Sequence, residues 1–153
     1  MTAANFLKYV DAGSYDAGYF HRAVRSDNET NSSFPIEVIQ ASRARGKSGL
    51  PTIPLERTSV TGLKHLAGTL SMARSSAPDS AASDFFVCIS DTPSLDYGGG
   101  RNADGQGFAA FGQIVSGMDV IKKIQQSPTL EGEDRNHQTL SPNIGIIRAY
   151  RKK

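Results

Sequence analysis

Apolar and polar positions alternate over short stretches, which marks most of the chain as strands joined by turns. Leu70 and Met72 alternate with polar neighbours, and this spacing predicts a strand over 68–74. A continuous apolar run over 84–90 is typical of a strand buried on both faces. The same reasoning predicts further strands over 19–24, 35–40, 108–115 and 144–150.

Two other segments have the spacing of amphipathic helices. Apolar residues recur on one face of a helix predicted over 2–11, which Gly13 ends. A capping-box pattern over 116–119 opens a second helix, whose apolar stripe includes Ile121 and Ile124. Because no strand–helix–strand rhythm appears, we predict a mostly β fold, a barrel or sandwich with helices packed on it.

Length and composition narrow the class of protein. The 153 residues predict a single domain over 1–153, since a domain has roughly 100–200 residues. A formal net charge of +2 is too balanced for a nucleic-acid-binding surface. No apolar run approaches the ~18–20 residues of a membrane-spanning helix, so neither nucleic acid nor membrane is an expected partner. Cys88 is the only cysteine, and its apolar neighbours predict a small buried side chain.

The familiar catalytic and metal-binding motifs are incomplete. The stretch 46–48 lacks the glycine that a phosphate-binding loop needs five residues earlier, where Ala41 stands. The histidines, His21, His65 and His137, lack the spacing of a zinc helix, and no nucleophile elbow surrounds any serine. We therefore expect no metal and no cofactor.

Several sequence fragments do indicate a protein family, because they occur in a characteristic order along the chain. They are Phe20-His21-Arg22, Ser71-Met72-Ala73-Arg74, Ser83-Asp84-Phe85-Phe86-Val87, Leu95-Asp96, and the stretches 107–112 and 117–121. Together they resemble the cyclophilin family of peptidyl-prolyl cis/trans isomerases, from about 2 to 150. The block 105–108 and the Ser-Met-Ala-Arg stretch are more similar to bacterial members than to animal ones.

The resemblance implies an eight-stranded antiparallel barrel with two capping helices. About six of those strands are expected here, because the family's β-hairpin before the first helix is lacking. It also implies an isomerase that rotates Xaa-Pro bonds and assists folding, with proline-containing peptides and unfolded proteins as partners. The alternatives are a proline-peptide-binding module with little turnover and a damaged reading frame whose product folds poorly. As written, the chain is expected in the cytoplasm as a monomer. If the start codon lies further upstream, a periplasmic location is expected instead. If the N-terminus is truly truncated, a strand-exchanged oligomer is possible.

The resemblance also implies a site. Arg22 matches the catalytic arginine and Gln40 its supporting glutamine. The expected substrate-binding positions are Val38, Ala73, Arg74, Phe86, Leu95 and Phe108. The chain between Arg22 and Gln40 is longer than usual in the family, and Glu37 and Val38 replace the usual Phe and Met. Phe34 and Ile36 are the candidates to complete that apolar wall.

These residue types suit the reaction because bond rotation needs no nucleophile or metal. Resonance in the prolyl amide gives a barrier of about 18–20 kcal/mol. At the twisted transition state the nitrogen regains a lone pair, to which a fixed cationic donor such as Arg22 can hydrogen-bond. Gln40 would orient the substrate or the guanidinium.

Overall fold

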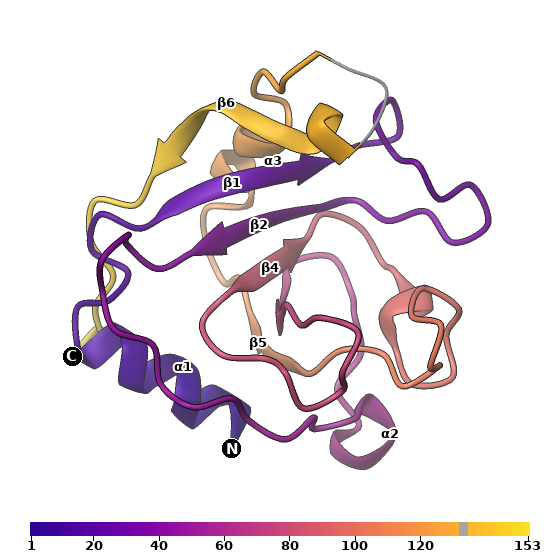
Figure 1. Cartoon of the computed structure of the whole chain (residues 1–153), viewed down its shortest axis with the longest axis horizontal. Coiled ribbons are helices and arrows are strands. Elements are labelled where there is room, and N and C mark those ends of the chain that lie inside the picture. The colour runs from indigo at the N-terminus through magenta and orange to yellow at the C-terminus, as the bar shows by residue number, and fades with distance from the viewer. Residues whose placement is uncertain (132–134) are drawn as a thin grey trace.

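The fold is built on one antiparallel sheet, seen in a computed structural model that describes residues 1–131 and 135–153 (Figure 1). Its strands are β1 (Tyr19–Val24), β2 (Val38–Ser42), β3 (Thr69–Met72), β4 (Phe85–Cys88), β5 (Ala110–Gln113) and β6 (Thr139–Gly145). The α-helices are α1 (Thr2–Asp11), α2 (Thr58–Thr61) and α3 (Met118–Gln125), and short 3-10 turns occupy Pro93–Leu95 and Arg135–Gln138.

The six strands lie in the order β5-β3-β4-β2-β1-β6. Over the described residues the sheet is open, with β5 and β6 at its edges, so the predicted barrel is present as an unclosed sheet. The two predicted helices are confirmed: α1 packs near β5, and α3 packs against β1 and β2. None of the described helices has the length and apolar character needed to cross a membrane.

The strand predicted over 144–150 is wrong in its bounds, because the last strand is β6, Thr139–Gly145. It pairs with β1, placing Ile144 opposite Phe20 and Thr139 opposite Arg22. Four of its seven residues are exposed and Pro142 lies within it, so its sequence resembles a turn, yet an edge strand tolerates both features. The strand predicted over 35–40 is likewise displaced, to Val38–Ser42.

Two apolar clusters fill the interior, and neighbouring residues of β4 belong to different ones. Phe85 packs in the larger cluster, beneath α1, while Phe86 packs in the smaller one with Val38 and Leu95. This division follows from the strand geometry, in which successive side chains point to opposite faces. Cys88 lies buried in the smaller cluster as predicted, and burial raises the pKa of its thiol to about 12.

Candidate active site

A cavity of about 890 Å³ opens over β1, β2 and β4 and collects nearly all of the expected site residues. Those that line it are Arg22, Val38, Gln40, Arg74, Phe86, Leu95 and Phe108. Ala73 packs against the apolar cluster that includes Phe86, without lining the cavity itself. The fold thus brings together side chains that lie far apart in the sequence.

Arg22 projects into this cavity from β1, and two glutamines orient its guanidinium. Its Nη1 donates to Gln40 Oε1 at 3.1 Å, and its Nε donates to Gln138 Oε1 at 2.9 Å. The contact with Gln40 follows from the strand register, which places the two residues opposite each other on β1 and β2. The expected support of Arg22 by Gln40 is therefore present as a direct hydrogen bond.

Gln138 is a site residue that the sequence did not indicate. It is 1% exposed, and its Nε2 donates to the Asn28 carbonyl at 3.0 Å while its Oε1 accepts from Arg22. A single buried glutamine more than a hundred positions from Arg22 carries no local motif. Only the pairing of β6 with β1 brings this part of the chain to the site.

The apolar end of the cavity is formed around Phe86. The Phe86 ring meets Phe108 edge to face at a centroid distance of 5.3 Å, and buried Leu95 and Val38 complete the same cluster. Such a recess suits the ring of a proline, which is apolar and has no donor on its nitrogen.

Ile36 completes the apolar wall of the cavity, which the resemblance to the family left incomplete because Glu37 stands in place of an apolar residue. Ile36 is buried in the Phe86 cluster and lines the cavity. The Glu37 carboxylate instead accepts a hydrogen bond from the Ser90 hydroxyl at 3.3 Å. Phe34 is half exposed, and its ring covers Gly100 so closely that any Cβ there would overlap it. Of the two candidates, Ile36 is therefore the one that fills the gap.

The buried carboxylate of Glu29 stabilises the long connection between Arg22 and Gln40. Glu29, with a side chain 4% exposed, accepts hydrogen bonds from the backbone amides of Asn31 and Ile36 and pairs with Arg101 at 3.0 Å. Burial alone raises the pKa of Glu29, but the two amides and the Arg101 charge outweigh it, so the pKa is lowered. This arrangement holds Ile36 in the cavity wall.

We expect Glu29→Gln to lower the free energy of unfolding by about 2 kcal/mol at pH 7, because it weakens hydrogen bonds to a charged group. A carboxyl whose pKa is depressed in the folded state stabilises above its unfolded pKa of about 4.3, and this stabilisation disappears as pH falls through the folded pKa. Urea unfolding of both proteins should therefore show a gap that is full at pH 7 and closes below about pH 4. Asp27→Asn, at an exposed carboxylate of the same connection, serves as control. A gap that stays constant over this pH range would contradict the assignment.

A serine, a histidine and an aspartate lie in hydrogen-bonded order beneath Phe86. His65 contacts Asp96 through Nδ1 at 2.7 Å and Ser71 through Nε2 at 2.9 Å. Burial lowers the pKa of His65 despite the neighbouring Asp96, so the neutral ring donates a hydrogen bond from Nδ1 to Asp96 and accepts one at Nε2 from the Ser71 hydroxyl. Ser71 is fully buried, which keeps substrate from its hydroxyl. The group instead supports the site, because the His65 ring stacks on Phe86 at 6.0 Å.

The other end of the cavity is polar. The Ser42 hydroxyl donates to Asp84 at 2.8 Å, His21 Nε2 lies 3.7 Å from the same carboxylate, and Arg45 lies over the Tyr19 ring. Among the described residues no group of three or more His, Cys, Asp or Glu side chains is placed to hold a metal ion. The arrangement thus offers an apolar recess, a fixed cation at its border and a polar surface for backbone.

Comparison with known proteins defines the family. The family model described as cyclophilin type peptidyl-prolyl cis-trans isomerase/CLD matches residues 1–150. The chain belongs to this cyclophilin-type family, as the order of sequence fragments predicted.

Among curated relatives, the chain is 36% identical over 129 residues to peptidyl-prolyl cis-trans isomerase A of Dickeya dadantii, covering 84% of this chain and 62% of that protein. It is 32% identical over 146 residues to peptidyl-prolyl cis-trans isomerase B of Escherichia coli, covering 95% of this chain and 82% of that protein. The chain therefore spans under two thirds of the first relative and most of the second. The bacterial character predicted from the sequence agrees with these two relatives.

The fold is shared with a cyclophilin type isomerase of Cryptosporidium parvum whose crystal structure was determined in the presence of the dipeptide Ala-Pro. That structure superimposes with a TM-score of 0.70 at 22% identity, covering 99% of this chain and 85% of that chain. The cyclophilin-like fold predicted from the sequence is thus confirmed.

Proposed function

We propose that this chain catalyses cis–trans rotation about Xaa-Pro peptide bonds, with proline-containing segments of unfolded proteins as its substrates. The observation that carries the proposal is the position of Arg22, which lines the same cavity as Phe86 and Phe108 and is oriented by Gln40 and Gln138. Family membership supports the same activity.

In the proposed mechanism the proline ring occupies the recess formed by Phe86, Leu95 and Phe108. Rotation about the C–N bond breaks amide resonance and makes the nitrogen pyramidal, and the Arg22 guanidinium then donates a hydrogen bond to the new lone pair. Since this lone pair is available only in the twisted state, the hydrogen bond stabilises the transition state more than the planar substrate.

Arg22 cannot account for the whole acceleration. A rate enhancement of ~10⁶-fold requires about 8 kcal/mol, whereas a hydrogen bond to a charged group contributes roughly 1.5–3 kcal/mol. The planar amide is more polar than the twisted one, so an apolar recess that excludes water favours twisting and supplies a further part.

The direct test is a protease-coupled assay on an Xaa-Pro peptide, in which the protease cleaves only the trans form. We expect the cis-to-trans rate constant to rise in proportion to the concentration of the protein. A folded sample that leaves the uncatalysed rate unchanged would overturn the proposal. If isothermal titration then showed binding of the peptide without turnover, the alternative of a proline-peptide-binding module would replace it.

A further inference from the structure

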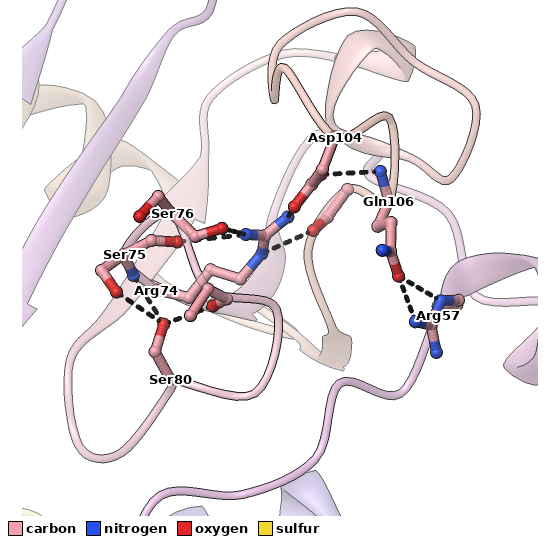
Figure 2. A network of polar contacts seen from close by, with 9 residues as sticks. Arg57, Arg74, Ser75, Ser76, Ser80, Asp104 and Gln106 are labelled. Atoms are coloured by element: carbon pink, nitrogen blue, oxygen red, sulfur yellow. Dashed lines mark hydrogen bonds and ion pairs between the residues drawn. The ribbon is translucent and has the colours of Figure 1, made fainter.

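Arg74 lines the cavity, yet its guanidinium is committed to internal partners (Figure 2). Its side chain is 1% exposed, and Nε donates to the Gly107 carbonyl at 2.9 Å. Nη1 donates to the carbonyls of Ser75 and Ser76, and Nη2 donates to both carboxylate oxygens of Asp104 at 3.0 and 3.1 Å. Every guanidinium nitrogen is thus bound within the protein, so the resemblance-based prediction that Arg74 binds substrate needs a different physical basis.

Two of the partners of Arg74, Asp104 and Gly107, belong to the loop that leads to Phe108 in the cavity. Asp104 also accepts the Gln106 amide at 2.9 Å, and the Gln106 side chain in turn accepts hydrogen bonds from Arg57 (Figure 2). The Gln106 amide and Arg74 lower the pKa of Asp104, so the carboxylate stays charged at neutral pH. The loop is therefore fixed by a continuous polar network.

The backbone at the end of this loop has a conformation that requires glycine at Gly107. Gly107 has a φ of +70°, and a Cβ there would lie 2.5 Å from the Leu95 carbonyl oxygen. That same oxygen accepts the Phe108 amide at 3.0 Å. Only glycine permits this close approach, and it sets the direction in which the Phe108 side chain leaves the backbone.

The Phe108 ring itself contacts Arg74. The guanidinium carbon lies 5.3 Å from the ring centroid, within range of a cation–π interaction, and the ring meets Phe86 at 5.3 Å. We infer that Arg74 is a positioning residue that acts through Phe108, fixing this ring as one wall of the proline recess while Asp104 fixes Arg74. This inference rests on the proposed isomerase function and assigns Arg74 a part in it without contact with substrate.

A double-mutant cycle tests the inference. We expect Arg74→Lys to lower kcat/KM about tenfold, because lysine keeps the charge but lacks the planar fork that reaches Gly107 and Asp104 together. In a Phe108→Leu background the same substitution should change kcat/KM less than twofold, since the ring through which Arg74 acts is gone. Asp104→Asn should act in the same direction as Arg74→Lys, and it replaces that variant in the cycle if the lysine protein does not fold.

Arg151→Lys is the matched control, because Arg151 forms a similar two-pronged pair with Asp11 on the exposed surface, and it should leave kcat/KM unchanged. If the effects of Arg74→Lys and Phe108→Leu multiply, Arg74 acts independently of Phe108, and the inference is overturned. No turnover by the unmodified protein would instead overturn the proposed function. In that case NMR spectroscopy still tests the inference, because the ring resonances of Phe108 can be identified by their loss in Phe108→Leu. A shift of these resonances in Arg74→Lys supports the inference, and unchanged resonances refute it.

Discussion

Replacement of Arg22 by alanine is expected to lower kcat/KM for an Xaa-Pro peptide about 100-fold, with the fold retained. Removal of one fixed donor from a transition-state site costs about 10²–10³ in rate in other enzymes, and the roughly 1.5–3 kcal/mol of a charge-assisted hydrogen bond corresponds to about 10- to 150-fold, so the two ranges meet at about 100-fold. The protease-coupled assay measures the loss, and circular dichroism checks the fold. The glutamine oxygens that accept from Arg22 become accessible to water in the variant, so stability should change little.

Two further variants sharpen this prediction. Arg22→Lys should still lose more than tenfold in kcat/KM, because a single ammonium cannot reach Gln40 and Gln138 while also facing the substrate. Arg148→Ala removes an exposed arginine, over the Tyr150 ring and outside the cavity, and should leave activity unchanged. Activity of Arg22→Ala within twofold of the unmodified protein would refute the role of this residue.

Replacement of Phe86 by alanine should reduce both stability and activity. Phe86 is 5% exposed, and its ring contacts Phe108 and His65, so its loss leaves a cavity and is expected to cost about 3–5 kcal/mol of unfolding free energy. The recess for the proline ring loses the aromatic wall around which it is formed. Urea unfolding measures the first effect and the isomerase assay the second.

The neighbouring Phe85 provides a matched control that separates these two effects. It is buried to a similar extent on the same strand but packs in the other apolar cluster, away from the cavity. Phe85→Leu and Phe86→Leu should each lose about 1–2 kcal/mol of stability, whereas only Phe86→Leu should lower kcat/KM by tenfold or more. Equal losses of activity in the two variants would mean that Phe86 contributes through stability alone.

The sequence predicted those parts of the fold in which local pattern and tertiary pairing agree. The apolar run of β4 and the amphipathic face of α1 sit as expected, because burial of those faces determines both elements. The last strand was misplaced because β6 forms by pairing with β1, and its polar, proline-containing sequence lacks the alternation that local analysis depends on.

The site shows the same division. Arg22 was found because the fragment 20–22 keeps a family pattern, and the resemblance carried by all the fragments then implied Gln40. The strand register places the two residues opposite each other. Gln138 could not be found, since its role depends on the distance between two elements and on a hydrogen bond to a carbonyl that any residue could provide. The internal use of Arg74 was also hidden, because residue type alone does not show which partners a guanidinium binds.

The hydrogen bond from Gln138 to the Asn28 carbonyl has a consequence for attempts to transfer or shorten the site. Gln138 meets Arg22 with one end of its amide and the connection between β1 and β2 with the other. A minimal peptide excised around Arg22 and Gln40 would therefore lack Gln138, the second glutamine that orients Arg22, which comes from the C-terminal part of the chain. Shortening that connection would remove the carbonyl that holds Gln138, and one of the two glutamines that orient Arg22 would lose its own support. A grafted or abbreviated version of the site therefore needs a substitute for this hydrogen bond.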